Sequence, residues 1–156
     1  MRVYLIGEAN PYSLDPTNAM LPYPERSAGA RLCHTILGMT EEKYLRIFSR
    51  LNLCGHLWNA QVARVRAALI LAECEIVSMR GVEVGLILLG RKVWDAFYPG
   101  QDWIPFSRRD WVLALPHPSG RSRLWNQAAF ENDPIKLARW QVSNLIHEAP
   151  WWKYEP

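Results

Sequence analysis

The sequence VGLILLG, residues 84–90, is an unbroken apolar run that ends at a glycine. A run of this length, rich in aliphatic and β-branched residues, is typical of a strand buried on both faces, with Gly90 as the turn. Strands buried on both faces occur in parallel sheets that helices cover on either side. The segment therefore predicts an α/β fold.

Three further segments are expected to join this strand. WVLAL at 111–115 ends at Pro116, RVYLI at 2–6 ends at Gly7, and LNLC at 51–54 lies between two helical segments. Apolar residues at helical spacing and capping residues at the ends predict helices between the strands. These helices span residues 27–38, 40–49, 59–73, 91–97 and 134–147. Alternating strands and helices indicate a three-layer α/β/α sandwich around a mostly parallel, four-stranded sheet.

The helix predicted over residues 59–73 is amphipathic. Asn59 stands at its N-cap position, where an amide oxygen can accept hydrogen bonds from the first turn. Its apolar residues recur every three or four positions, as one face of a helix requires. We interpret that stripe as the face that packs on the domain; it is formed by Val62, Val65, Leu69 and Ala72.

Length and composition bound the class of protein. The 156 residues are expected to form one domain over 1–156, and 49% hydrophobic with 21% charged residues excludes a largely disordered chain. Apolar runs stay well below the roughly 18 to 20 residues that cross a bilayer, so no membrane contact is expected. No secretory signal follows Met1, and a cytoplasmic protein is expected.

Cofactor chemistry is not indicated by any motif. Cys33, Cys54 and Cys74 are widely spaced without a CxxC, so we expect reduced, buried thiols and no metal. Neither GxGxxG nor GxxxxGK[ST] occurs, and no organic cofactor is predicted. The net charge of +3 is compatible with an anionic partner, and the eight tryptophans suit interfaces or nucleobase stacking.

Polar, loop-forming sequences follow three of the four predicted strands, at residues 7–12, 52–55 and 116–123. In open α/β sheets, ligands bind in the crevice at the carboxyl ends of the strands. We therefore expect one crevice there. The polar residues that these ends bring to it are Glu8, Asn10, Asn52, His117, Ser119 and Arg121.

Two of these strand ends carry motifs. GEANPY at 7–12 resembles the first motif of the uracil-DNA glycosylase superfamily, in which Asp or Asn directly precedes Pro. HPSGRSR at 117–123 resembles its second motif, and the two occur in the same order as in that family. The resemblance implies a uracil-DNA glycosylase-like fold and a glycosylase that hydrolyses the N-glycosidic bond of uracil or a modified pyrimidine flipped out of DNA. It implies an abasic product and no cofactor. The activity is expected to be monofunctional, since neither motif contains a Lys.

The resemblance also implies catalytic roles. Asn10 matches the residue that positions the attacking water, and Glu8 matches a general base of another branch, although it lies one residue farther from Pro11. His117 is similar to the donor that hydrogen-bonds the pyrimidine O2, where negative charge accumulates. Which of Glu8 and Asn10 dominates water activation is left open.

Base binding is implied for three residues. Asn52 resembles the asparagine that makes paired hydrogen bonds to a pyrimidine edge. Tyr12 resembles the aromatic residue that excludes a methyl group at C5. Tyr23, ahead of RSAG at 26–29, is similar to a base-stacking aromatic of another branch if one inserted residue is allowed.

DNA contacts are implied for the second motif and the arginines near it. Arg121 stands where relatives carry a Leu or Arg that wedges into the duplex as the nucleotide flips out. Ser119 is expected to contact phosphate or stabilise its loop. Arg123, Arg108 and Arg109 are expected to extend a basic edge along DNA.

The sequence mixes motifs of several branches, which leaves alternatives open. Tyr12 favours a tight uracil pocket, whereas the mixed motifs allow a larger base such as glucosylated hydroxymethylcytosine. Some relatives in the superfamily are implicated in antiviral attack on modified phage DNA. A noncatalytic module of the same fold is the other alternative. It would bind DNA or a protein through Trp151, Trp152, Lys153 and Tyr154. We expect a monomer.

Overall fold

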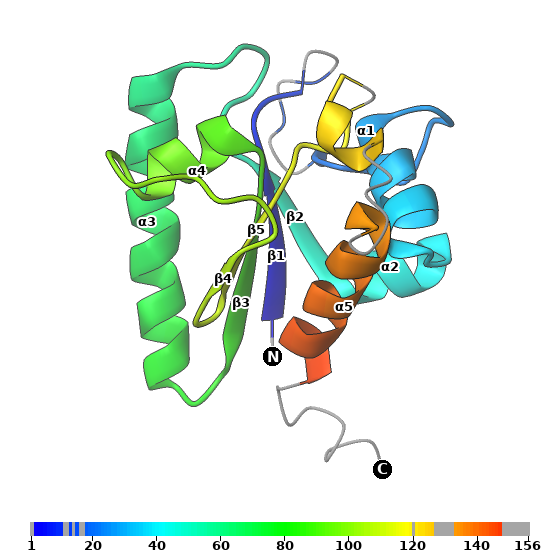
Figure 1. Ribbon diagram of the computed structural model, residues 1–156. Coiled ribbons are helices and arrows are strands. Elements are labelled where there is room, and N and C mark those ends of the chain that lie inside the picture. Colours follow the sequence, from blue (N-terminus) through cyan, green and yellow to red (C-terminus); the bar gives the residue numbers. More distant parts are fainter. Residues whose placement is uncertain are drawn as a thin grey trace.

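Five strands form one sheet at the centre of this computed structural model, which describes residues 2–10, 13, 15, 18–119, 121–126 and 133–147. The strand order is β2-β1-β3-β5-β4 (Figure 1). All neighbouring pairs are parallel except β4 with β5. The predicted α/β class and mostly parallel sheet are confirmed, but the predicted number of four strands is wrong. The strands are β1 (Arg2–Gly7), β2 (Phe48–Asn52), β3 (Val84–Leu89), β4 (Arg108–Arg109) and β5 (Val112–Leu115).

The additional strand, β4, is an antiparallel edge of two residues. Asp110, with a φ of 51°, lies in the turn that joins it to β5. Two backbone bonds extend this hairpin, from Phe106 N to Ala114 O (2.8 Å) and from Ala114 N to Ser107 O (2.9 Å). Two consecutive arginines show no apolar alternation, which explains why the sequence does not predict a strand here.

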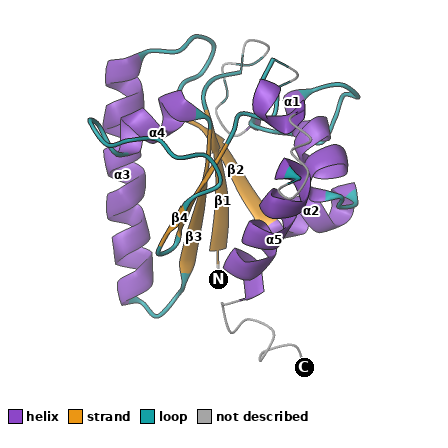
Figure 2. Ribbon diagram, in the orientation of Figure 1, coloured by secondary structure: helices purple, strands orange, loops and turns teal. Residues whose placement is uncertain are grey.

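Helices cover both faces of the sheet (Figures 1 and 2). Leu5, Ile87 and Leu113 point into one core, and Ile6, Leu88 and Ala114 point into the other, because successive strand residues face opposite sides. Layers of helix, sheet and helix result. The first core is covered by α1 (Ala28–Ala30), the π-helical η2 (Arg31–Leu37), α2 (Glu41–Ile47) and α5 (Pro134–His147), and the second by α3 (Ala60–Met79) and α4 (Arg91–Phe97).

Two helix boundaries differ from the prediction. The helix expected over 40–49 ends at Ile47, because the chain becomes extended at Phe48 and enters β2 three residues earlier than predicted. The helix expected to end near Glu73 continues to Met79, since no glycine or proline interrupts it before Gly81.

The face on which α3 packs also differs from the prediction. Val62, Val65 and Leu69 are exposed, and the buried residues of the helix are Ala63, Ala67 and Cys74. Small side chains let a helix approach the sheet closely, whereas the larger residues of the predicted stripe point away from it. Among the described residues, no helix is long and apolar enough to cross a membrane.

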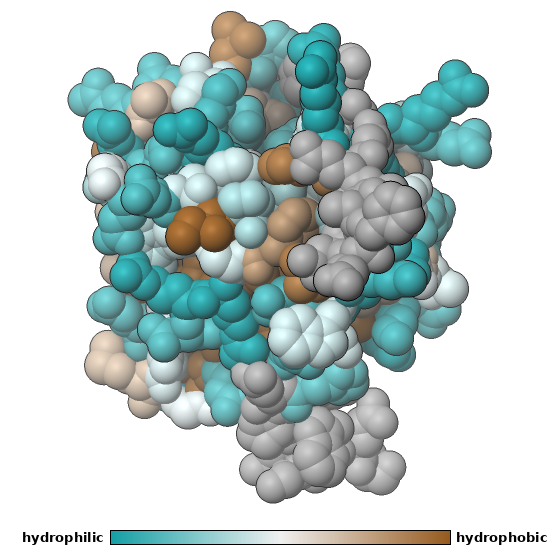
Figure 3. All heavy atoms as spheres, in the orientation of Figure 1, coloured by the Kyte–Doolittle hydropathy of each residue, from teal (hydrophilic) through white to brown (hydrophobic). Residues whose placement is uncertain are grey.

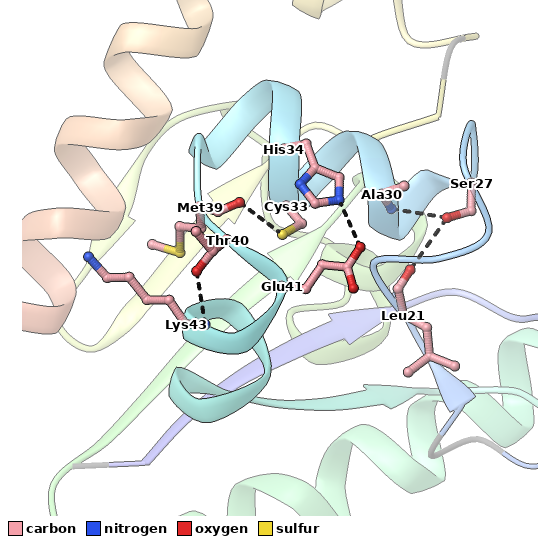
Figure 4. A network of polar contacts seen from close by, with 9 residues as sticks. All are labelled: Leu21, Ser27, Ala30, Cys33, His34, Met39, Thr40, Glu41 and Lys43. Atoms are coloured by element: carbon pink, nitrogen blue, oxygen red, sulfur yellow. Dashed lines mark hydrogen bonds and ion pairs between the residues drawn. The ribbon is translucent and has the colours of Figure 1, made fainter.

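Side chains cap the helices of the first layer and fix the loop before them (Figure 4). The Ser27 hydroxyl accepts a hydrogen bond from Ala30 N (3.0 Å) and donates one to Leu21 O (3.4 Å). Thr40 Oγ1 accepts from Lys43 N (3.3 Å), as the sequence predicts for an N-cap. The loop that follows β1 is thereby joined to the helical layer.

Candidate active site

The carboxyl ends of β1, β2, β3 and β5 lie at one edge of the sheet, the upper edge in Figure 1. Backbone bonds hold the loops there together. Cys54 N donates to Glu8 O (2.9 Å), Asn10 N donates to Gly55 O (2.8 Å), and Gly90 N donates to Leu115 O (2.8 Å). Segments distant in the sequence therefore form one continuous rim.

Glu8 and His117 approach each other across Gly90. A Cβ atom at position 90 would lie 3.2 Å from His117 Cβ and 3.3 Å from Glu8 Oε1, and Gly90 has a φ of 101°. An L residue rarely adopts such a φ, and its side chain would push against both groups. Glycine at this position lets the ends of β1 and β5 bring Glu8 and His117 together.

Lys92 is a site residue that the sequence motifs do not contain. Its Nζ lies 3.4 Å from Glu8 Oε2 and 5.8 Å from the centre of the Trp58 ring. It stands in the first turn of α4, directly after β3. One sequence signal points to it: Lys92 follows the unbroken apolar strand β3, whose carboxyl end lies at the same edge of the sheet.

The protonation state of His117 is set by its surroundings. Ser119 N donates to His117 Nδ1 (3.2 Å), so the neutral ring carries its proton on Nε2, and Trp125 Nε1 holds the backbone by donating to His117 O (2.9 Å). Burial lowers the pKa of His117; Glu8 opposes this shift and Lys92 adds to it. The imidazole is therefore neutral at pH 7, with an Nε2–H group to donate.

Asn52 brings a buried polar group to the same edge. It is 2% exposed, and its Oδ1 has no hydrogen-bond partner among the described residues. A Cβ atom at Gly7 would collide with this Oδ1, so glycine there makes room for the amide. A buried acceptor without a partner is costly, which points to a ligand that supplies an N–H or O–H group.

Two more of the catalytic and base-binding candidates, Asn10 and Tyr23, lie on the loop after β1. The Asn10 amide is oriented by a hydrogen bond from its Nδ2 to Asn18 O (3.0 Å). Tyr23 is half-exposed and precedes a cis peptide bond to Pro24. Tyr12 lies outside the described residues, as do the C-terminal residues 151–154 considered for the binding-module alternative.

The four arginine candidates fall into two groups. Arg121 and Arg123 are exposed and follow Ser119. Arg121 lies in a turn, and Arg123 begins the short 3-10 helix η3 (Arg123–Asn126). The structure does not bring Arg108 and Arg109 to them, because β4 pairs with the amino half of β5. Arg109 donates to Gln101 Oε1 (2.6 Å). Arg108 lines an open cavity of about 790 Å³ at the other edge, with Cys74, Glu83, Asp110 and Trp111 among its neighbours.

The site is thus formed by side chains from separate strand ends. Among residues 2–147 that the structure describes, no group of three or more His, Cys, Asp or Glu side chains is arranged to hold a metal ion. A scan against protein-family models, a search of curated proteins and a search of solved structures found no match to this chain.

Proposed function

We propose that this protein is a DNA glycosylase of the uracil-DNA glycosylase type, which hydrolyses the N-glycosidic bond of uracil or a modified pyrimidine flipped out of DNA. One observation carries the proposal. Glu8, Asn52 and His117, from three different strand ends, lie at one edge of the sheet, and the Asn52 oxygen there has no hydrogen-bond partner in the described part of the chain.

These groups fit the charges that develop when the bond breaks. The departing pyrimidine becomes negative at O2, and the neutral His117 can donate its Nε2 proton in a hydrogen bond to that atom. Asn52 Oδ1 can accept the N3–H group of a uracil-like base, which would remove its cost of burial.

Hydrolysis also needs a water molecule positioned to attack C1′ of the sugar. Asn10 would hold this water, and the Glu8 carboxylate would take its proton as the oxygen bonds to C1′. The ion pair with Lys92 holds Glu8 on the rim. Arg121 and Arg123, both exposed beside the second motif, would contact phosphates and fill the space that the flipped nucleotide leaves.

The test is base release from end-labelled oligonucleotides that contain uracil, hydroxymethyluracil, a thymine mismatch or glucosylated hydroxymethylcytosine, followed by alkali. We expect cleavage at one of these bases, reduced by orders of magnitude in His117→Ala, in Asn52→Ala and in the Glu8→Gln/Asn10→Ala double variant. Glu83→Gln, at the other edge of the sheet, is the matched control and should retain full activity. Unchanged turnover in all three site variants would overturn the assignment.

Two further outcomes separate the alternatives. If the folded protein binds these DNAs and releases none of the bases, the noncatalytic module replaces the glycosylase. Borohydride reduction during turnover tests the monofunctional mechanism, because it would trap a Schiff base between Lys92 and the abasic sugar. We expect no adduct; one that disappears in Lys92→Met would show a lyase step.

A further inference from the structure

An exposed apolar stripe runs along the outer face of α3. The face drawn in Figure 3 is mainly hydrophilic, and its apolar side chains form small separate groups. On α3, by contrast, large apolar side chains are exposed along the length of one helix. The exposed fractions are 43% for Val62, 57% for Val65, 64% for Leu69, 48% for Ile76 and 80% for Met79.

The spacing of these residues is that of a coiled-coil seam. With the exposed Ala72, they occur at intervals of three, four, three, four and three residues. This strict heptad pattern puts Val62, Leu69 and Ile76 at the a positions and Val65, Ala72 and Met79 at the d positions. Over so short a length, the drift of a straight helix away from a 3.5-residue repeat is small.

Among the described residues, none of the six seam side chains belongs to either hydrophobic core. The opposite face of α3, through Ala63, Ala67 and Cys74, packs on the sheet and α4. In Figures 1 and 2, α3 forms one side of the molecule, and the sheet lies on its inner side. A helix that is apolar on both faces needs a second partner for the outer one.

The stripe is self-complementary when a second helix runs in the opposite direction. A twofold axis between residues 70 and 71 puts Val62 opposite Met79, Val65 opposite Ile76 and Leu69 opposite Ala72 of the second copy. Each layer then combines an a with a d position, and the large Leu69 fills the space above the small Ala72. A parallel pair would put Ala72 against Ala72 and leave a gap in the seam.

The charges beside the seam favour the same arrangement. Arg66 and Glu73 each directly follow a d position, and such residues face one another across an antiparallel pair. Arg66 would lie near Glu73 of the second copy, and the twofold axis repeats the pair. Two helices of this length bury on the order of 1,000 Å², the lower limit of a specific interface, so the association would be reversible.

We infer that this protein forms a homodimer through antiparallel pairing of α3 with α3 of a second copy. The arrangement is independent of the proposed activity, because no seam residue is one of the candidate site residues. The two sites would face opposite ends of the dimer, both open to substrate.

The test is sedimentation of the full chain over a range of concentrations. We expect a concentration-dependent shift from 18.0 kDa to twice that mass. Leu69→Glu should weaken dimerisation at least tenfold, whereas Arg64→Glu, exposed on the same helix but off the seam, should leave it unchanged. Circular dichroism checks that both variants fold. A wild-type chain that stays monomeric into the millimolar range, or equal dimerisation of Leu69→Glu, would overturn the inference.

Disulfide cross-linking tests the relative orientation of the two α3 helices. The native cysteines are buried, so they should not form competing disulfides. A mixture of Val62→Cys and Met79→Cys proteins should cross-link, and Met79→Cys alone should not. Arg66→Glu and Glu73→Arg should each weaken the dimer, and the double exchange should restore it. Efficient cross-linking of Met79→Cys with itself would contradict the antiparallel pair.

Discussion

At the scale of single residues, glycines decide which polar groups meet. Gly7 leaves room for the Asn52 amide, and Gly90 lets Glu8 and His117 approach across the end of β3. His117 then loses solvent, and a neighbouring cation disfavours its charged form further. The imidazole is consequently kept as a neutral donor, the form that the proposed glycosylase reaction would need beside a departing anionic base.

Titration of His117 tests this account directly. Its pKa should lie below the usual 6.5. Glu8→Gln should lower the pKa of His117 further, because a stabilising negative charge is removed, and Lys92→Met should raise it. Imidazole resonances followed by NMR across the acid range give each value. A wild-type pKa above 6.5, or the opposite order of the two variants, would contradict the assignment.

The same shift has a consequence for stability. Because the unfolded chain binds the His117 proton at a higher pH than the folded one, the free energy of unfolding falls as pH decreases from 6.5 toward the folded pKa. Above 6.5 both states are neutral, and this contribution is fully retained. His117→Gln should flatten that part of the stability profile.

At the scale of elements, the first turn of α3 determines where the helix begins, and the residues on its two faces determine how it packs. Asn59 Oδ1 accepts hydrogen bonds from Gln61 N and Val62 N, both at 3.0 Å. These bonds satisfy two of the backbone donors that every helix leaves unpaired at its start. The cap fixes where the helix begins, while packing alone decides which side faces the sheet.

Replacement of Asn59 measures the contribution of that cap. Asn59→Ala should lower the free energy of unfolding by about 0.5 to 2 kcal/mol, whereas Asn59→Asp retains the acceptor and should change it little. Urea denaturation of dilute protein compares the two variants with wild type. Equal losses in both would show that the side-chain oxygen does not stabilise the helix.

At the scale of the whole molecule, one sheet separates two cores. Leu5 and Ile6 are neighbours in β1, both are 0% exposed, and they pack in opposite cores. Among the described elements, both helical layers therefore pack on the same sheet, one on each face. If one core unfolds, the strands that also form the other core lose their packing on one face. The domain should therefore unfold as a unit.

Alanine substitutions on the two faces test this coupling. Leu5→Ala and Ile6→Ala should each lower the free energy of unfolding by about 2 to 5 kcal/mol, and the exposed Arg2→Ala should have a small effect. In each variant, far-ultraviolet circular dichroism and tryptophan fluorescence should give coincident unfolding curves. Separate transitions would mean that the cores unfold independently.

The sequence by itself determined the features that depend on neighbouring residues. Unbroken apolar runs predict β3 and β5, and capping residues predict the starts of α2 and α3, because these signals lie within a few positions along the chain. Polar residues after the strands also place Glu8, Asn52 and His117 at one edge, since parallel strands end on the same side.

Only the tertiary structure decided the features that depend on distant residues. Lys92 meets Glu8 across 84 positions of sequence, and no local pattern predicts that ion pair. No local pattern predicts β4 either. Its two arginines are extended because they pair with β5, and this pairing keeps them away from the second motif. For α3, both faces are apolar in the sequence. The inner one fully buries only small residues where the helix packs closely on the sheet, with Ile70, Leu71 and Val77 partly buried beside them, and the heptad seam is left outside.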